Sequence, residues 1–359
     1  MYYAQGETME VIAHHLGVSR STVSRLLARA RDEGVVRIEL REPGAAGSLE
    51  RRFLDEYGVR ARIVHVREGA TEIHRLQQVA AVAATTLTEM IDAEATQTAV
   101  GSSGSTAVGS TGPSGPTAVG SSGSTAVGSH GPAAVGHEAA PTTDGGFVVG
   151  VAWGTTMGEL SAALPTRRVP GLTLVQLNGA SDPLREGPSA GDVLSRMGQS
   201  LGARTIAFPV PAFFDQVATR RAMWSERSVK RVLAVASRAR IAVFGVGSLS
   251  SDLPSQVYSG GHLTRVDLAV VHREEVVGDV CTVLLRADGT WRDIDLNARA
   301  TGPTPAQLAR IPRRLCVVAG TGKARAALAA LRARVATDLV VDDATARAVL
   351  ALSHRKDRT

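Results

Sequence analysis

Apolar residues near the start of the chain recur every three to four positions in two short runs, which is the spacing of amphipathic helices. Thr8 can cap the first predicted helix, and Gly17 follows it where a helix end favours a left-handed residue. Ser19 can cap the second predicted helix. The residues that share the inner faces are Val11, Ile12, His15 and Leu16 in the first helix, and Val23, Leu26, Leu27 and Ala30 in the second. The pattern therefore predicts two short helices that pack across a tight turn, as in a helix-turn-helix.

The other face of the second predicted helix is polar and basic. It consists of Ser19, Arg20, Ser21, Thr22, Ser24, Arg25 and Arg29. Such a face suits a helix that enters the DNA major groove, because guanidinium groups bond to guanine edges while hydroxyl groups and helix-end amides hold phosphates. An ordinary pair of core helices is the alternative interpretation. After Gly34, apolar residues at 36, 38 and 40 alternate with charged ones, which predicts a strand beside the DNA-reading helix.

Beyond residue 57 the pattern changes to near-continuous apolar runs that alternate with helical periods. The predicted strands cover 62–66, 147–153, 172–177, 241–247, 315–320 and 338–342. The clearest predicted helices cover 72–91, 190–201, 323–334 and 344–352, and another follows the strand at 147–153 and ends at Leu164. This alternation is typical of a mostly parallel, doubly wound α/β sheet. Ligands of such sheets bind beyond the carboxyl ends of the strands, where the segments WGTT, GVGS and AGTGK occur.

A tract rich in Gly, Ser, Thr, Ala and Pro interrupts this domain between residues 95 and 145. Within it, TAVGSSGSTAVGS at 98–110 recurs letter for letter at 117–129. This composition buries too little apolar surface to offset chain entropy, so we expect a disordered insertion rather than a small β-solenoid, for which two copies are too few. The predicted organisation is a helix-turn-helix domain at 1–42, a linker at 43–57 that includes a short helix from Leu49, and an α/β domain at 58–352 interrupted by 95–145.

Composition narrows the function classes. A net charge of +6 and a pI near 9.9 favour a polyanionic partner. Cys281 and Cys316 each lie inside an apolar run, so we expect buried free thiols. The histidines lack metal-ligand spacing, and no cofactor or metal is predicted. No apolar stretch has the length of a membrane span and no signal-peptide layout is present, so we expect no membrane partner and a cytoplasmic protein.

The first forty-odd residues closely resemble the N-terminal domain of the SorC family of bacterial sugar-responsive transcription regulators, above all in SRSTVSRLL and EGVVRI. In that family another helical stretch usually precedes the Tyr2-Tyr3 pair, and its loss would expose part of the packing face behind Leu16 and Leu26. GVAWGTT, FGVGS, VVGDV and VVAGTGKARAALAAL resemble the successive signatures of the family's effector domain. The resemblance implies the fold of glucosamine-6-phosphate deaminase and ribose-5-phosphate isomerase, with a domain that binds a phosphorylated sugar and generally lacks catalytic activity.

The resemblance also implies a set of effector-binding residues. They are Gly154, Thr155 and Thr156 for a phosphate-binding turn, Asp279 for an acidic position facing sugar hydroxyls, and Lys323 for a basic position near the phosphate. Gly245 and Gly247 lie at the end of a predicted strand, so we expect them at the same effector-binding site. The sequence departs from the family where a glycine-rich stretch reads LNGASDP, and it lacks an arginine that some members carry near the phosphate. Each position alone has an ordinary structural interpretation: Lys323 as a solvated helix-start lysine, Asp279 as a turn cap, and the two glycines as a tight connection.

The sequence therefore predicts a DNA-binding transcription regulator, not an enzyme. We expect a phosphorylated sugar to modulate its binding to operator DNA, and we expect a homodimer or homotetramer, because paired DNA half-sites multiply specificity. The alternative is a sugar-phosphate isomerase or deaminase of the same fold, preceded by an unrelated helical hairpin. Such an enzyme needs a base and an acid over the first two sugar carbons, and no motif assigns that pair.

Overall fold

The computed structural model describes residues 9–19, 22–26, 29, 44–103, 146–180, 189–251 and 255–356. The chain divides into two compact units, Met1–Ser48 and Leu49–Thr359. The predicted strand at 36–40, the packing residues Leu27 and Ala30, and residues 104–145 lie outside the described residues.

The first unit contains the predicted turn between two helices. Helix α2, Met9–Leu16, ends at Gly17, whose φ of 65° is left-handed. The Val18 amide then donates to the Ala13 carbonyl at 3.0 Å, which completes a Schellman-type C-cap. Ser19 begins the second helix, because its hydroxyl accepts the Thr22 amide at 3.2 Å. The predicted C-terminal glycine and the Ser19 cap are therefore confirmed.

The packing face of the first unit differs from the prediction. Ile12, Ala13 and Val23 are buried and form one small cluster. His15 is exposed, as are Leu16 at 52% and Leu26 at 53%. The prediction that Leu16, Leu26 and His15 belong to the buried face is wrong. The described core of this unit consists only of Ile12, Ala13 and Val23.

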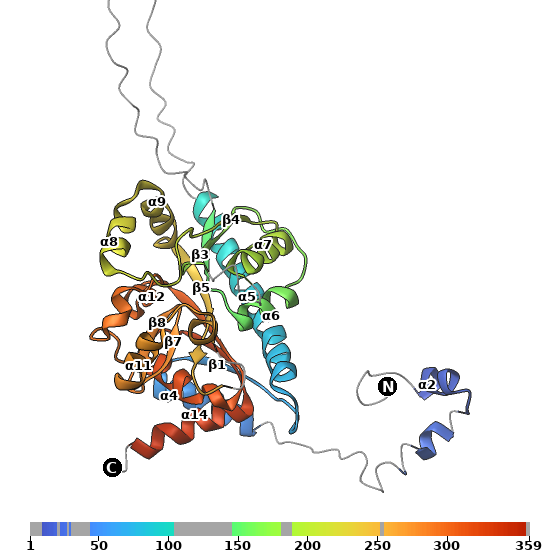
Figure 1. Cartoon of the computed structure of the whole chain (residues 1–359). Coiled ribbons are helices and arrows are strands. Elements are labelled where there is room, and N and C mark those ends of the chain that lie inside the picture. Colours follow the sequence, from blue (N-terminus) through green and yellow to red (C-terminus); the bar gives the residue numbers. More distant parts are fainter. Residues whose placement is uncertain are drawn as a thin grey trace, which may run out of the picture. The chain divides into compact units, whose positions relative to one another are not determined.

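The second unit is built on a seven-stranded sheet (Figure 1). Each pair of neighbouring strands is parallel, which confirms the predicted parallel α/β sheet. The strand order is β1-β10-β9-β5-β2-β3-β4. The strands are β1 Arg60–Val64, β2 Phe147–Val151, β3 Leu172–Gln176, β4 Arg204–Ile206, β5 Ala239–Gly245, β9 Arg313–Val318 and β10 Asp338–Asp342.

Helices cover both faces of this sheet, and the strands bury alternate residues against each. Val149 of β2 packs in one core, with residues of α5, α6 and α7, and its neighbour Val148 packs in the other, with residues of α4, α9, α13 and α14. The helices of the first face are α5 Glu72–Ser103, α6 Thr155–Ala163 and α7 Ala190–Leu201. Those of the second are α4 Gly44–Tyr57, α9 Arg227–Ala236, α13 Ala324–Arg332 and α14 Asp343–Lys356.

The segments between the sheet strands add smaller elements that the sequence analysis did not assign. Helix α8, Val217–Ser225, precedes α9. Between β5 and β9 lie an antiparallel sheet of three strands in the order β6-β7-β8 and several short helices. They are β6 Gly247–Ser248, α10 Gln256–Ser259, α11 Arg265–Arg273, β7 Val276–Val280, β8 Val283–Arg286, the 3-10 turn η1 Asp295–Ala298 and α12 Pro305–Leu308. After β9, the 3-10 turn η2, Thr321–Lys323, leads into α13.

Two predicted boundaries need correction. Residues 44–48 of the predicted linker at 43–57 are helical and continue into the expected helix, whose Leu49 and Phe53 are buried in the sheet core. Helix α5 also runs through Ser103, into the predicted insertion at 95–145. The carboxylate of Glu94 is held by Arg240 at 2.6 Å, and Ala95 packs against the core, so this end of α5 is anchored despite its composition. In the part of the chain that the structure describes, no helix is both long and apolar enough to cross a membrane.

Candidate effector pocket and nucleic-acid interface

A pocket lies at the carboxyl ends of the parallel strands, where the winding of the sheet changes direction. From β2 the chain proceeds outward through β3 and β4, then returns to place β5 on the other side of β2. The segments that follow β2 and β5 therefore diverge, and the space between them is the usual ligand site of such sheets. We call this space the effector pocket. The seven predicted effector-binding residues all line it: Gly154, Thr155, Thr156, Gly245, Gly247, Asp279 and Lys323.

One wall of the effector pocket is the N-terminus of α6. Gly154 precedes this helix with a φ of 127°, which side-chain-bearing residues rarely adopt, and no side chain caps the helix. The first intrahelical bond runs from the Gly158 amide to the Gly154 carbonyl at 2.9 Å. The amides of Thr155, Thr156 and Met157 thus have no acceptor within the helix, and they give this wall a partial positive charge that suits an anion.

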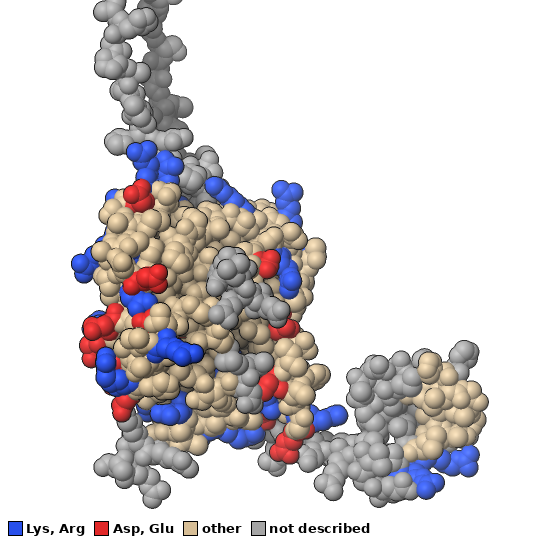
Figure 2. Space-filling view, viewed as in Figure 1, with Lys and Arg blue, Asp and Glu red and all other residues tan. Residues whose placement is uncertain are grey.

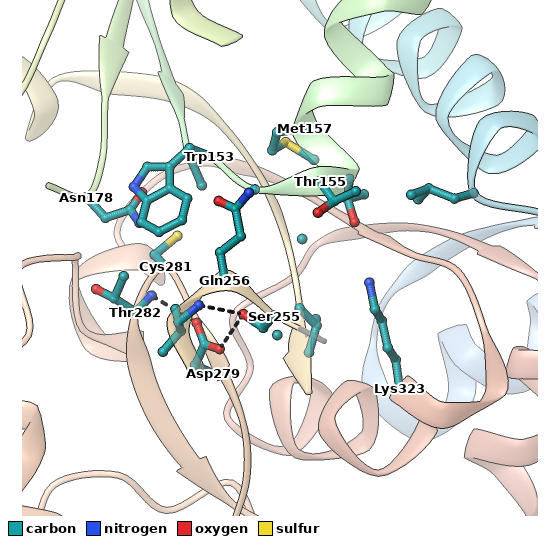
Figure 3. A pocket seen from close by; sticks show the side chains of 18 residues that line it. Trp153, Thr155, Met157, Asn178, Ser255, Gln256, Asp279, Cys281, Thr282 and Lys323 are labelled. Carbon is teal, nitrogen blue, oxygen red and sulfur yellow. Dashed lines mark hydrogen bonds between the residues drawn. The ribbon is translucent and has the colours of Figure 1, made fainter. Parts of the chain in front are cut away.

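Lys323 stands across from this wall. It follows β9, is only 7% exposed, and extends toward Thr155 in the pocket (Figure 3). Burial lowers the pKa of its ammonium group, while the charges of Glu72 and Asp279 act in the opposite direction. None of the described residues forms a hydrogen bond or close ion pair with the ammonium group. The interpretation of Lys323 as a solvated lysine is therefore wrong, and its side-chain nitrogen faces the pocket, where it can bind an anion.

Asp279, on β7, supplies a buried carboxyl group on the floor of the pocket. Its Oδ2 accepts the Thr282 amide at 3.1 Å, and its Oδ1 lies 3.5 Å from the Ser255 hydroxyl (Figure 3). Burial raises its pKa to about 6, although the hydrogen bonds and the charge of Lys323 lower it. The carboxyl group therefore does cap a turn, as its ordinary interpretation holds, and it also faces the pocket.

The two glycines of the FGVGS segment allow close approaches. A Cβ atom on Gly245 would lie 3.3 Å from the Cβ atom of Thr156, so glycine lets the end of β5 lie against α6. Gly247 lies beside Asp279 in the β6–β7 pairing. These close contacts explain why both positions carry the smallest residue.

The floor of the pocket also contains a strained turn. Cys281 and Thr282 connect β7 to β8 as a two-residue hairpin loop, with φ values of 49° and 72°. Both residues thus have the left-handed conformation of a type I′ turn, which Asn and Gly favour and a β-branched threonine resists. The Thr282 hydroxyl accepts the Gly302 amide at 3.2 Å, which helps to hold the turn. Strain of this kind often accompanies binding sites because the surrounding structure must maintain it.

Both cysteines are free and buried, as predicted. Burial raises the pKa of the Cys281 thiol well above its usual range and that of Cys316 to about 12. Both groups are therefore uncharged near neutral pH and unsuited to nucleophilic chemistry. Among the described residues, no group of His, Cys, Asp and Glu side chains is arranged to hold a metal ion.

Several other residues that line the pocket are not among those predicted from the sequence. They include Trp153, Asn178, Ser255, Gln256, Cys281 and Thr282. Trp153 and Asn178 follow β2 and β3, so their place at the end of a predicted strand was a usable signal. The remaining four come from the segment between β5 and β9, where apolar periodicity predicts no regular order of elements, so no sequence signal placed them here.

The predicted DNA-reading residues lie in the first unit. Ser24, Arg25 and Arg29 are exposed, and Figure 2 shows the described basic side chains of this unit together at its surface. Ser19 and Thr22 are joined by a hydroxyl–hydroxyl hydrogen bond of 2.8 Å, so both contribute to the helix start. Arg20 and Ser21 lie outside the described residues. Arg25 and Arg29 are one helical turn apart and can reach the same groove.

Comparisons with known proteins match both units. The model of a putative sugar-binding domain matches residues 123–351, and that of a helix-turn-helix domain matches residues 1–39. A domain of a possible sugar-binding transcriptional regulator from Arthrobacter aurescens TC1 is 36% identical, with a TM-score of 0.66, over 87% of this chain and 100% of that chain.

Two further relatives match nearly the whole chain. The deoxyribonucleoside regulator of Bacillus subtilis is 25% identical over 357 residues, which cover 98% of this chain and 95% of the relative. The full-length sorbitol operon regulator SorC from Klebsiella pneumoniae has the same fold, with a TM-score of 0.63 and 20% identity over 97% of this chain and 96% of that chain.

Proposed function

Since this chain belongs to the SorC-type family of transcriptional regulators, which join a helix-turn-helix to a sugar-binding domain, we propose that a phosphorylated sugar in the effector pocket controls its affinity for operator DNA. The observation that carries the phosphate assignment is the buried ammonium group of Lys323, which has no close partner among the described residues and lies opposite the open N-terminus of α6.

Charge and hydrogen bonding both favour a phosphate at this position. A phosphate dianion can accept hydrogen bonds from the amides of Thr155, Thr156 and Met157 and pair with the Lys323 ammonium. A phosphate on the floor of the pocket would instead lie next to the carboxylate of Asp279, and the two negative charges would repel each other. We therefore place the phosphate toward α6 and Lys323, and the sugar hydroxyls toward Asp279, which can accept hydrogen bonds from them.

Binding rather than catalysis is the proposed role of the pocket. The relatives described above are regulators, and the carboxyl group of Asp279 is already engaged by the Thr282 amide. An isomerase needs a base and an acid that both reach the first two sugar carbons. Incubation with candidate sugar phosphates, followed by nuclear magnetic resonance, is expected to show no conversion.

The regulator is proposed to act as a dimer or larger homo-oligomer on paired DNA half-sites. One helix-turn-helix contacts little DNA, and a second copy on an adjacent half-site multiplies the affinity. The effector changes DNA affinity only by binding two arrangements of the protein unequally, so operator DNA must change effector affinity by the same factor.

Fluorescence anisotropy with a labelled DNA fragment from upstream of the protein's own gene tests this function. We expect binding at moderate salt, and an affinity that changes when a phosphorylated sugar is added but not when its unphosphorylated form is added. Light scattering of the same complex gives the number of copies bound. Absence of DNA binding would contradict the regulator, whereas DNA binding that no sugar phosphate alters would contradict the proposed effector.

A further inference from the structure

Two carboxamide groups line the effector pocket without hydrogen-bond partners. The Oδ1 atom of Asn178 and the Oε1 atom of Gln256 are buried, and no residue that the structure describes donates a hydrogen bond to either. Asn178 is only 2% exposed. Both side chains lie beside Trp153, whose indole nitrogen is already used by the Gly179 carbonyl at 2.5 Å (Figure 3). The two carboxamides therefore offer unused hydrogen-bonding capacity inside the pocket.

Two other carboxamides in the same unit, the buried Gln176 and the half-buried Asn297, have hydrogen-bond partners. The side-chain nitrogen of Gln176 donates to the main-chain carbonyl of Asn178 at 2.7 Å, and its side-chain oxygen accepts the Phe208 amide at 3.3 Å. Asn297 accepts the Leu284 amide at 2.8 Å and donates to two carbonyls. A buried polar group without a partner destabilises the fold, so two such groups that face one pocket indicate a ligand that completes them.

The strand order places Asn178 at the side of the pocket away from the proposed phosphate position. Lys323 follows β9 and Asn178 follows β3, and β5 and β2 lie between these strands. Three interstrand steps separate the two strand ends by roughly 14 Å. Figure 3 shows Lys323 and Asn178 on opposite sides of the pocket, with Gln256 and Asp279 between them. A ligand whose phosphate lies at Lys323 thus reaches Asn178 only with its remote end.

We propose that Asn178 and Gln256 recognise hydroxyl groups at the end of the effector remote from its phosphate. The effector is then a phosphorylated sugar or polyol of at least five carbons with free hydroxyls at that end; this inference rests on the proposed function. A carboxamide both donates and accepts, as a hydroxyl does, so each can pair with a hydroxyl group in either sense. Each carbon–carbon bond adds at most about 1.5 Å, so a three-carbon phosphate falls up to about 3 Å short of a five-carbon one.

Calorimetry on the full-length protein with ligands of graded length tests the proposal. The probes are inorganic phosphate, glycerol 3-phosphate, pentyl phosphate, ribose 5-phosphate, ribitol 5-phosphate and glucitol 6-phosphate. We expect at least one of the last three to bind about tenfold or more tightly than glycerol 3-phosphate and pentyl phosphate, since each lost hydrogen bond costs roughly a factor of three to ten. Pentyl phosphate has five carbons but no hydroxyl groups, so it distinguishes the effect of ligand length from the effect of hydrogen bonds to the hydroxyls.

Variants assign the effect to the two side chains. Asn178→Leu and Gln256→Leu are each expected to weaken the tightest five- or six-carbon probe about tenfold while leaving glycerol 3-phosphate and inorganic phosphate unchanged. The melting temperature of the ligand-free Asn178→Leu protein is expected to stay the same or rise, because an unpaired carboxamide is removed. Gln199→Leu, at an exposed carboxamide on α7, is the matched control and should change no ligand affinity. Gln256 is only half-buried, so its variant still tests the proposal if the Asn178 variant does not fold.

The outcomes separate this inference from the proposed function. If glycerol 3-phosphate or pentyl phosphate binds as tightly as the polyhydroxy probes, or if the variants weaken every phosphate equally, the recognition role is overturned while the phosphate site stands. If none of the probes binds the parent protein, the proposed function fails, and this inference fails with it.

Discussion

A Cβ atom on Gly247 would lie 1.9 Å from Oδ1 of Asp279 and 2.7 Å from the hydroxyl of Ser255. The backbone of β6 therefore lies directly against the carboxyl group on the pocket floor, and any larger residue at 247 must displace that group. Gly247 thus determines the position of a carboxyl group that lies more than thirty residues later in the chain.

Gly247→Ala is expected to abolish the response of DNA binding to a sugar phosphate, since the displaced carboxyl group can no longer face the ligand. Gly191→Ala is the control, because Gly191 lies in the first turn of α7 with only the Ser189 hydroxyl nearby, at 3.6 Å. Anisotropy titrations of both variants with and without effector provide the measurement. An intact response in Gly247→Ala would show that the pocket floor tolerates the shift.

Lys323→Met is expected to remove the effector response without weakening DNA binding in its absence. The loss of a charge-assisted hydrogen bond costs about 1.5–3 kcal/mol, or roughly ten- to a hundredfold in effector affinity. The ligand-free variant should also unfold at higher temperature, because a buried ammonium group without a close partner is removed. Arg325→Met, on the exposed side of α13, is the control. A variant with normal effector affinity would exclude Lys323 as the phosphate ligand.

Asp279→Asn is expected to change how stability depends on pH. The pKa of Asp279 is about 6 in the folded protein, against an ordinary value of 3.8. The folded state therefore binds more protons than the unfolded state between these values, so this group's contribution to the free energy of unfolding declines as pH rises from about 4 to about 6. The decline amounts to up to about 3 kcal/mol. Urea denaturation from pH 4 to pH 7 should show a gain in the stability of Asp279→Asn relative to the parent as pH rises; parallel curves would contradict the assignment.

Arg20→Ala combined with Arg25→Ala is expected to weaken specific operator binding while leaving effector binding intact. A lost guanine contact costs roughly 1–3 kcal/mol, and a lost phosphate contact mainly reduces the dependence on salt. Operator affinity at several salt concentrations distinguishes these two contributions. Arg227→Ala, at an exposed arginine of α9, is the control. Unchanged operator affinity in the double variant would show that another element reads the DNA.

Deletion of residues 106–143, with a short Gly/Ser join, is expected to leave the melting temperature nearly unchanged. Loop-closure free energy grows slowly, by only about 0.6 kcal/mol for each doubling of loop length. A longer deletion that also removes residues 92–105 should lower the melting temperature, because the ion pair of Glu94 with Arg240 and the packing of Ala95 are then lost. Equal melting temperatures for the two deletions would show that the end of α5 adds no stability.

Sequence periodicity predicted the sheet better than it predicted the pocket. Strands such as Phe147–Val151 and Leu172–Gln176 are buried on both faces, so their apolar runs were unambiguous. The predicted helix at 190–201 matches α7, since a capping box at Ser189 and Asp192 and a left-handed Gly202 define its ends. Short elements such as α10 and β6 have too few residues to show a period, and they escaped prediction.

The errors at helix ends have two physical causes. The last turns of α5 carry Thr, Ala, Val, Gly and Ser, so their composition matches the repeats. The helix is anchored there by tertiary contacts, which are the ion pair of Glu94 with Arg240 of β5 and the packing of Ala95 against the core. In the first unit, Leu16 and Leu26 have the spacing of core residues, but the neighbours needed to bury them do not follow from spacing. The unpaired carboxamides of Asn178 and Gln256 could not be predicted either. Whether a side chain has a hydrogen-bond partner depends on its neighbours in the folded structure, and the sequence pattern does not show these neighbours.

The position of the repeat tract in the sheet has an evolutionary consequence. Helix α5 begins at Glu72, next to Gly320 at the pocket edge, and runs back to the opposite edge, where Thr98 and Gly146 lie near the start of β2. The chain thus leaves and re-enters the domain at the far ends of the strands, a strand length of roughly 16 Å from the effector pocket. A gain or loss of repeat units therefore changes the protein's length at the edge of the described sheet opposite the effector pocket, so we expect selection on the pocket to bear little on the number of repeats.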